Sequence, residues 1–451
     1  MSNSTVRSPT DYVDSVSVSY SAATVNALRR LVGNTGPRGI LARGGLTSSG
    51  DASRNAGGHL VELQGNLASP AVEWIDWERR IARLAAGATL AEINSQLSKQ
   101  GWFLAAVSAD AQTTLGAAIA TDSSGLGRGP RGSIAAAASA LEIVDGRGEI
   151  ERLSGEDHTG PMFRATVAGL GLTGVVTSVE ARITPISTTW MKLDTFRCPD
   201  WAATLAQCNL SSTTHPYSYA HIDLTARGDA VGRSIVQSGA HAGLKDVPDT
   251  RRGDALAFDL EPTNPGRGMT DRSPRWLQRT LARTAFSAEA SHDVGLTPAS
   301  RFFHPDTVSV SPLGPGRHNP PAVRYLACVP DDHVELLVEI LHRIGALGCA
   351  APVGTLRRHN AQSPGYLSAI IRGWSLEIDC GPPSLALGAT LDELDERIAE
   401  VGGRVGLATD SRLRPELLEQ MYPQLPEWQS IRRDLDPARV FNSDLARRLE
   451  L

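Results

Sequence analysis

Residues 37–63 read PRGILARGGLTSSGDASRNAGGHLVEL: a short apolar run, a segment rich in Gly, Ser and Thr, and a second apolar run. Gly44, Gly45 and Gly50 allow a positive φ and leave room beside the backbone, so successive N–H groups can point at anionic oxygens. The hydroxyls of residues 47–49 add further donors. The pattern predicts two strands joined either by a loop that holds a diphosphate or by an ordinary glycine-rich hairpin.

The loop differs from the two common phosphate loops. It lacks the Gly-x-Gly-x-x-Gly spacing of a dinucleotide-binding βαβ unit and the Lys-Ser/Thr ending of a nucleoside-triphosphate loop. It resembles instead the phosphate loop of FAD flavoproteins of the vanillyl-alcohol-oxidase type. Within that superfamily, Ile40-Leu-Ala-Arg-Gly, Ser48, Gly50-Asp51 and Asn55-Ala-Gly-Gly resemble the bacterial decaprenylphosphoryl-ribose 2'-oxidases.

The C-terminal segment carries the same resemblance. The matching residues are Asp410-Ser411-Arg412, Met421-Tyr422-Pro423, Glu427-Trp428, Arg432-Arg433, Asp436-Pro437 and the ending that begins Phe441-Asn-Ser-Asp-Leu. The resemblance extends from about Val18 through this ending. It implies an α+β fold, with a two-lobed FAD-binding domain and a separate antiparallel-sheet substrate domain backed by helices.

The composition is that of a globular protein. A chain of 451 residues with 41% hydrophobic and 21% charged residues has room for two or three domains. The net charge of −5 argues against a nucleic-acid partner, because binding phosphates requires a positive surplus. With no apolar stretch near the roughly 20 residues of a membrane span, and no signal-peptide core, we expect a cytoplasmic protein. The five cysteines form no Cys-x-x-Cys pair, and no cluster has metal-ligand spacing, so we expect buried free thiols and no metal.

Periodicity predicts the elements of the N-terminal part. Helices are expected over residues 22–33 and after Thr89, where Thr89 and Glu92 have the spacing of a capping box. Strands are expected within 141–150 and 170–185. The segment 113–125 has too little side-chain bulk for a core helix, and the resemblance implies that it lines the flavin.

The middle of the chain predicts a different region. Strands are expected at 217–223, 324–330 and 373–379, and amphipathic helices are expected to start at Asp332 and Thr390. Residues 244–300 have weak periodicity and predict a long mobile loop or lid. We therefore expect an FAD-binding domain at 1–187, a substrate domain at 188–405, and a segment at 406–451 that returns to the FAD-binding domain.

The loop and the resemblance together assign FAD as the cofactor. Thr47 stands where some members of the superfamily attach the flavin covalently, so we expect FAD to be held without a covalent link. The expected FAD-binding residues are Ala42, Arg43, Gly44, Gly45, Leu46, Thr47, Ser48, Ser49, Gly50, Asp51, Ala52, Ala109, Thr114, Leu115, Gly116, Ala117, Thr121, Asp122, Ser123, Ser124, Val176 and Gly406.

Several positions that matter in the resembled subfamily carry other residues here. Ser124 stands where those oxidases have a histidine, Glu377 where they have a cysteine, and Thr409 where they have a lysine. Gly406 and Ser49 replace two tyrosines. The scaffold is kept while these positions change, which indicates either different chemistry or lost chemistry.

Oxidising an alcohol with a flavin requires a base for the hydroxyl proton, and a cation near the developing negative charge helps. Glu377 is the candidate base or hydroxyl anchor, although on a strand its carboxylate faces either the site or solvent. Arg357 and Arg324 are the candidate cations, with a structural ion pair as the alternative for each. His221, where relatives carry an aromatic residue, and Thr409 complete the catalytic candidates.

Three hypotheses of function remain at this point. The first is an FAD-dependent oxidoreductase acting on a secondary hydroxyl of a ribofuranosyl-like or nucleoside-like substrate. The second is a flavoprotein that catalyses an epimerisation, elimination or rearrangement without net oxidation. The third is a pseudoenzyme that keeps the fold as a binding subunit. The electron acceptor, with a partner reductase as one option, and the oligomeric state stay open.

Overall fold

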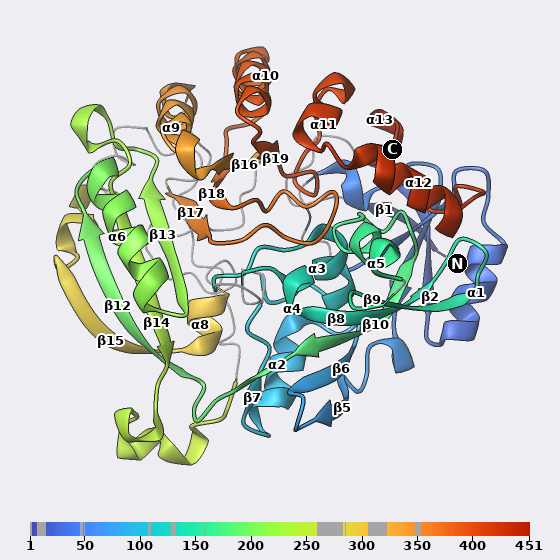
Figure 1. Cartoon of the computed structure of the whole chain (residues 1–451), viewed down its shortest axis with the longest axis horizontal. Coiled ribbons are helices and arrows are strands. Elements are labelled where there is room, and N and C mark those ends of the chain that lie inside the picture. The colour runs from blue at the N-terminus through green and yellow to red at the C-terminus, as the bar shows by residue number, and fades with distance from the viewer. Residues whose placement is uncertain are drawn as a thin grey trace.

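The structure is a computed structural model that describes residues 2–6, 15–45, 48, 50–106, 110–127, 132–157, 159–258, 283–284, 286–304, 323–347 and 353–451. Over these ranges the chain is an α+β protein, as the sequence predicts, and helices cover sheets on several sides (Figure 1). No helix in the same ranges is long and apolar enough to cross a bilayer.

The loop of residues 37–63 lies in a four-stranded sheet with the order β1-β2-β4-β3. Its strands are β1 (Ser2–Val6), β2 (Ser15–Ala22), β3 (Ile40–Arg43) and β4 (His59–Leu63). β3 and β4 run parallel, with Ile40 opposite His59. The hairpin alternative is therefore wrong, because parallel neighbours need a crossover connection, and this one contains η1 (Asp51–Ser53).

Two predicted helices begin at side-chain caps. α1 (Val25–Gly33) follows Thr24, whose hydroxyl accepts a backbone N–H of the first turn. α2 (Leu90–Ser98) has the predicted capping box, in which Thr89 and Glu92 each accept the other's backbone N–H. These bonds satisfy N–H groups that a helix start leaves without partners.

A second sheet of five antiparallel strands has the order β5-β6-β10-β8-β9. Its strands are β5 (Val72–Asp76), β6 (Ile81–Ala85), β8 (Ala138–Val144), β9 (Ile150–Ser154) and β10 (Val175–Arg182). The strands predicted within 141–150 and 170–185 are therefore confirmed. The smaller elements nearby are β7 (Trp102–Phe103), β11 (Thr184–Pro185), α4 (Ile134–Ala137) and α5 (Gly160–Thr166).

The expectation that 113–125 forms no core helix is wrong. α3 (Leu115–Thr121) is helical and buries Leu115, Ala118 and Ile119 completely. Its small residues pack closely against the neighbouring backbone, since a Cβ at Gly116 would lie only 3.2 Å from the carbonyl oxygen of Ala86. α3 is therefore packed in the core by the close approach of its backbone to its neighbours rather than by large side chains.

The third large sheet has eight antiparallel strands in the order β15-β12-β14-β13-β17-β18-β16-β19. They are β12 (Trp190–Cys198), β13 (Tyr217–Asp223), β14 (Ser234–His241), β15 (His292–Pro298), β16 (Arg324–Pro330), β17 (Val353–His359), β18 (Gly373–Asp379) and β19 (Arg404–Val405). α6 (Trp201–Thr214), α9 (Leu336–Leu347) and α10 (Leu385–Glu400) cover its outer face (Figure 1). The predicted strands of the middle region are confirmed.

The opposite, inner face of this sheet is turned toward the N-terminal part of the chain. The ring of His241 on β14 lies 4.8 Å from Phe103 of β7, and Tyr217 at the start of β13 forms a bridge with Gly127. α8 (Ala299–Phe303) packs on the same side, where Phe303 lies 4.9 Å from Tyr217. Successive side chains of a strand point to opposite faces of the sheet. Every second side chain of these strands therefore faces the FAD-binding region, and the others face the covering helices.

Two predicted helix starts and the predicted lid need correction. α9 begins at Leu336 rather than at Asp332, and α10 begins at Leu385, where Ser384 rather than Thr390 supplies the cap. In 244–300, the described residues form η5 (Leu244–Asp246), η6 (Asp249–Asp254), β15 and the start of α8, while 259–282 and 285 lie outside the described residues. β15 shows little periodicity because it is an edge strand exposed along most of its length.

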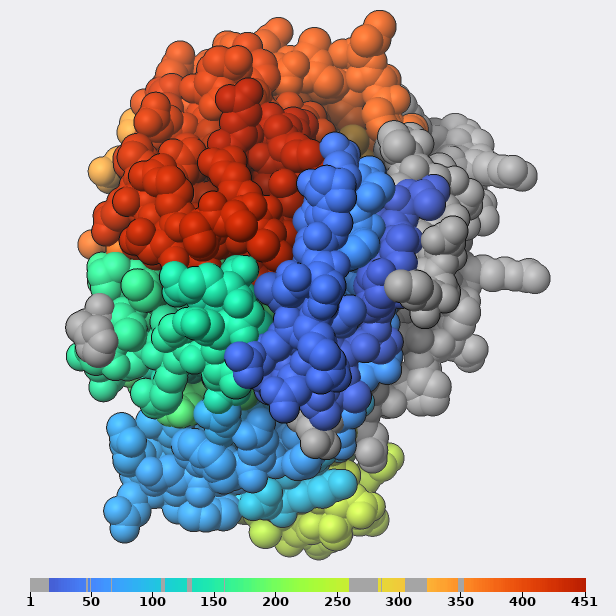
Figure 2. Space-filling model, turned by 90° about the vertical axis from the view of Figure 1, so that its right-hand side faces the viewer, coloured from blue at the N-terminus to red at the C-terminus, as the bar shows by residue number. Residues whose placement is uncertain are grey.

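Of the C-terminal helices, α11 (Pro415–Met421) packs against α10, while α12 (Leu425–Leu435) packs against α5 and α13 (Asp444–Arg448) against η1 of the N-terminal part. Ile40 donates its N–H to the carbonyl of Val440 at 2.8 Å, and Figure 2 shows the red C-terminal residues directly beside the blue N-terminal ones. These contacts support the division 1–187, 188–405 and 406–451, which we propose as the domain organisation.

The cysteines are buried free thiols, as predicted, at Cys198, Cys208, Cys328 and Cys380. Cys349 lies outside the described residues. Burial raises the pKa of Cys328 to about 12, so this thiol stays protonated and unreactive at neutral pH.

Candidate active site

A cavity of about 480 Å³ lies between the end of β3, α3 and the start of β10. Its volume is in the range of roughly 300–1,000 Å³ that is usual for ligand and cofactor sites. Six glycines and five alanines belong to its wall, so much of the wall is backbone. The predicted FAD-binding residues in the wall are Ala42, Arg43, Gly44, Gly45, Ser48, Ala52, Thr114, Gly116, Ala117, Thr121 and Val176.

The residues of this wall fit a bound FAD. A Cβ at Gly44 would lie 2.4 Å from the hydroxyl oxygen of Thr114, and one at Gly45 would lie 2.3 Å from the carbonyl oxygen of Gln112, so only glycine lets the loop approach α3 this closely. Arg43 pairs with Glu62, while its buried Nε has no hydrogen-bond partner in the described ranges. Exposed backbone, hydroxyls and a cation with a free N–H suit a diphosphate ligand.

Other wall residues were missed from the sequence. They include Glu62, Gln64, Gly87, Gly171 and Gly174. Gly171 and Gly174 were visible as glycines before β10, and both have positive φ, of 73° and 157°. That glycine pair is the sequence signal for this part of the wall, whereas the sequence pattern predicts only a strand within 170–185.

The far end of the loop contacts the C-terminal segment instead of the cavity. A Cβ at Gly50 would lie 2.2 Å from the carbonyl oxygen of Asp410, and Asp51 donates its N–H to that same oxygen. The Asp51 carboxylate pairs with Arg448 at 2.8 Å, and Arg448 also bonds Asp410 at 2.8 Å. These two predicted FAD-binding residues thus join the loop to α13.

Among the remaining predicted FAD-binding residues, Leu115, Asp122 and Ser123 are described by the structure and do not line the cavity. Leu115 is buried in the core, and Ser123 bonds Thr121 at 3.1 Å. Asp122 has a positive φ of 47° and accepts hydrogen bonds from Ser133 and Ser368, so it ties α3 to two distant segments. Leu46, Thr47, Ser49 and Ala109 lie outside the described residues.

Glu377 lies on the inner face of the eight-stranded sheet. Its outer neighbours Leu376 and Ile378 are buried, which confirms that the carboxylate points the other way. One carboxylate oxygen accepts a hydrogen bond from Arg357 at 3.0 Å, and the other lies 3.7 Å from Arg324. The structure therefore brings three of the five catalytic candidates together.

The two arginines differ in their surroundings. Arg357 is only 5% exposed, and its buried Nε has no hydrogen-bond partner among the described residues. Arg324 is more accessible and also pairs with Asp379 at 2.7 Å. Arg357 is thus the cation held deep in this face, with Glu377 as its counter-ion.

His221 reaches the same face from β13. Thr355 on β17 separates it from Glu377, because Thr355 lies opposite both residues in the sheet register. Burial lowers the pKa of His221 to about 4, and the positive charge of Arg357 acts in the same direction. The imidazole is therefore neutral at neutral pH.

Ser124 belongs to the segment that connects α3 to this face. Its buried hydroxyl oxygen finds no hydrogen-bond partner within the part of the chain that the structure describes. Gly127, three residues further, forms an antiparallel bridge with Tyr217 at the start of β13. Because the two segments run in opposite directions, Ser124 lies on the side of this bridge toward which β13 continues to His221. The segment that follows the cavity wall thus leads to the sheet face.

Thr409 and Gly406 are close to the edge of the same face. A Cβ at Gly406 would lie 2.6 Å from the side chain of Leu326, which is the direct neighbour of Glu377 in the sheet. The Thr409 hydroxyl donates to the carbonyl of Gly406 at 3.0 Å. A larger side chain at position 406 therefore requires the Leu326 side chain to shift.

His359, on the inner row of β17, predicts a pH dependence of stability. Burial lowers its pKa to about 3, helped by the charges of Arg357 and Arg358. The unfolded chain binds a proton below about pH 6.5 and the folded chain does not, so stability is lost as the pH falls from about 6.5 toward 3. From pH 7 to pH 5 the expected loss is about 2 kcal/mol in the free energy of unfolding.

Urea unfolding of the parent and of His359→Gln at both pH values measures this contribution. Gln cannot titrate but can still bond Ser375, which lies 2.8 Å from Nε2 of His359. The variant should lose about 2 kcal/mol less than the parent. The exposed His333→Gln variant is the control and should lose as much as the parent. An equal loss in His359→Gln would contradict the prediction.

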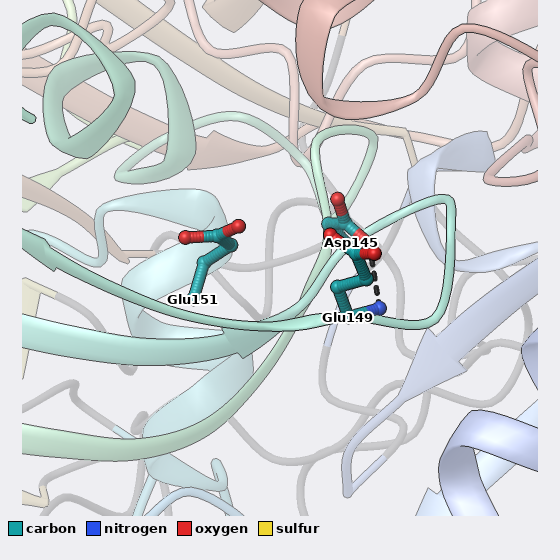
Figure 3. Close-up of side chains that lie close together, drawn as sticks. All are labelled: Asp145, Glu149 and Glu151. Atoms are coloured by element: carbon teal, nitrogen blue, oxygen red, sulfur yellow. Dashed lines mark hydrogen bonds between the residues drawn. The ribbon is translucent and has the colours of Figure 1, made fainter.

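Among the described residues, the carboxylates of Asp145, Glu149 and Glu151 have their ligand atoms close together, as Figure 3 shows. Asp145 accepts the backbone N–H groups of Arg147 and Glu149 at 2.9 and 2.8 Å and pairs with the Arg147 guanidinium. These bonds account for the carboxylate as part of the turn between β8 and β9. The cluster gives no reason to infer a metal.

Comparison with known proteins agrees with this geometry. Residues 20–154 match the family model of the FAD binding domain. A protein of Streptomyces coelicolor, described as an uncharacterized protein in the mprA 5' region, is 34% identical over 364 residues, which are 78% of this chain and 96% of that protein. The decaprenylphosphoryl-β-D-ribose oxidase of Mycolicibacterium smegmatis is 28% identical over 420 residues, 92% of this chain and 90% of that enzyme.

The fold, the glycine-walled cavity and these matches define a class of protein. The chain belongs to the FAD-binding oxidoreductases of the vanillyl-alcohol-oxidase type. Within them it resembles the decaprenylphosphoryl-β-D-ribose oxidase subfamily, with altered residues at the candidate active site.

Proposed function

We propose that this protein binds FAD non-covalently and oxidises a secondary hydroxyl of a ribofuranosyl-like or nucleoside-like substrate. The observation that carries the proposal is the continuity between the two halves of the site. α3 forms part of the cavity wall, and the segment after it pairs with β13 beside the inner face that bears His221, Arg357 and Glu377.

The cavity wall is the proposed FAD site, with Arg43 and the backbone around Gly44 and Gly45 toward the diphosphate. When bound, FAD supplies the acceptor for the hydride of an alcohol oxidation. Glu377 is proposed as the base that takes the hydroxyl proton or as the anchor of a hydroxyl. Arg357 holds the Glu377 carboxylate in place and, with Arg324, makes this wall suitable for a polyhydroxylated or anionic substrate.

The absorption spectrum of the purified protein tests this function first. We expect a yellow protein that releases all of its colour into the supernatant on acid precipitation. Under anaerobic conditions, methyl β-D-ribofuranoside or adenosine should bleach the flavin band, because the substrate's electrons remain on the flavin. Retention of colour by the precipitated protein would contradict the non-covalent link.

Other outcomes separate the competing functions. A yellow protein that converts the sugar while the flavin stays oxidised would favour an epimerisation, elimination or rearrangement over net oxidation. A yellow protein that neither reacts nor bleaches with either compound would count against a ribofuranosyl substrate. A colourless protein that takes up no added FAD would overturn the proposal and favour a binding subunit.

A further inference from the structure

Among the residues that the structure describes, Nδ1 of His221 and Nε of Arg357 find no hydrogen-bond partner, and both atoms are buried on the inner face. Thr355 lies directly opposite His221, and Arg357 follows two residues later on the same strand. The two side chains are therefore diagonal neighbours on one face of adjacent strands. Buried polar atoms without partners are uncommon in native proteins, and each calls for an explanation.

The chemistry of the two atoms is complementary. Arg357 remains protonated, so its Nε carries an N–H that can only donate. The His221 ring is neutral, since burial and the charge of Arg357 lower its pKa to about 4. Next to a cation, the favoured tautomer of a neutral imidazole is the one whose lone pair, rather than its N–H, faces the positive charge. We therefore assign Nδ1 of His221 as a hydrogen-bond acceptor. One donor and one acceptor are thus left on two diagonal neighbours of the same sheet face.

The neighbouring side chains do not supply hydrogen-bond partners for these two atoms. Within the part of the chain that the structure describes, the Tyr219 hydroxyl, next to His221, donates to Gln237 at 2.7 Å. Glu377 uses one carboxylate oxygen on the Nη1 group of Arg357, at 3.0 Å, and leaves Nε of that arginine unsatisfied. Ile235, on the other side of His221 in the register, offers no polar side-chain atom.

We propose that His221 and Arg357 form a hydroxyl-binding subsite, in which one substrate hydroxyl donates to Nδ1 and accepts from the Nε–H. A hydroxyl fits because it donates and accepts through one atom, whereas a carboxylate cannot donate and an ammonium group cannot accept. This inference rests on the proposed function and makes it more specific. It names these two side chains as residues that select a sugar bearing a hydroxyl at one particular carbon.

Binding of methyl β-D-ribofuranoside and of its 2-deoxy and 3-deoxy analogues tests the subsite. Calorimetry on the FAD-loaded protein, reduced beforehand with dithionite, measures affinity without turnover. The parent should bind one of the two deoxy analogues about 10- to 100-fold more weakly than the complete sugar, the usual cost of losing a hydrogen bond to a charged group. In His221→Leu this difference in affinity should become smaller, because only the hydrogen bond from the Arg357 Nε–H remains.

Arg357→Lys is the second variant, because lysine keeps a cation for Glu377 but has no Nε–H. It should also reduce the discrimination, because only the His221 acceptor remains, while His221→Gln, whose amide can still accept, should keep more of it than His221→Leu. The exposed His333→Leu variant is the control and should discriminate like the parent. A readout independent of affinity is the ¹⁵N resonance of His221 Nδ1, which should shift when the complete sugar is added.

The results separate the subsite from the proposed oxidation. Equal affinity of the parent for all three sugars, or no binding of any, would overturn the subsite, as would undiminished discrimination in both His221→Leu and Arg357→Lys. Flavin reduction in the parent is measured separately. If discrimination depends on His221 while no sugar bleaches the flavin, the subsite stands and the proposed oxidation fails.

Discussion

Gly44→Val should weaken FAD binding about tenfold or more in an otherwise folded protein. A Cβ at this position would lie 2.4 Å from the Thr114 hydroxyl oxygen and 2.9 Å from Cβ of Ala117, and both residues line the cavity. The branched side chain must push the loop away from α3 or enter the space of the ligand. Such overpacking costs about 1–3 kcal/mol, so we expect FAD affinity to fall about tenfold or more.

The measurement is the ratio of flavin to protein after purification, followed by titration with added FAD. Gly388→Val is the matched control, because a Cβ at Gly388 meets nothing within 4 Å. The control should retain parental FAD content, and circular dichroism should show both variants folded. Parental FAD affinity in Gly44→Val would show that this wall is not where the cofactor binds.

Glu377→Gln should reduce turnover by about 10²–10⁴ if Glu377 is the base, which is the usual contribution of a general base. Gln keeps the shape of the side chain and can still accept a hydrogen bond from Arg357, but it cannot take a proton. FAD content should stay unchanged, because Glu377 is absent from the cavity wall. The measurement is the rate of anaerobic flavin reduction by the most effective ribofuranoside, compared with the parent.

The anchor role predicts a different result for the same variant. Affinity for the sugar would then fall while the rate at saturating sugar stays close to that of the parent. Glu393→Gln is the control, since Glu393 pairs with Arg343 on the helix-covered side and should affect neither quantity. Parental rate and affinity in Glu377→Gln would exclude both roles.

Local signals predicted those elements that depend on short stretches of sequence. The Thr89–Glu92 capping box, the strands β13, β16 and β18 and the glycine-rich loop can each be predicted from a few neighbouring residues. Alternation of apolar residues also predicted that Glu377 points away from the buried row of β18.

The errors share a physical cause. α3 is helical because glycine and alanine let it pack closely on a distant strand, an effect that side-chain bulk in the segment itself cannot reveal. α10 begins at Ser384, although Thr390-x-x-Glu393 has equally good cap spacing, so local propensity does not choose between the two starts. β15 acquires its strand structure from pairing with β12.

The sequence alone determined the class of protein, the position of the loop and the set of changed residues, because each depends on residue type and spacing. Only the tertiary structure decided what these residues contact. It showed that Gly50 and Asp51 contact the C-terminal segment, that Glu377 is held by Arg357, and that His221 is left with an unpartnered nitrogen. These contacts join positions far apart in the chain, and their geometry follows from strand register and packing rather than from any local pattern.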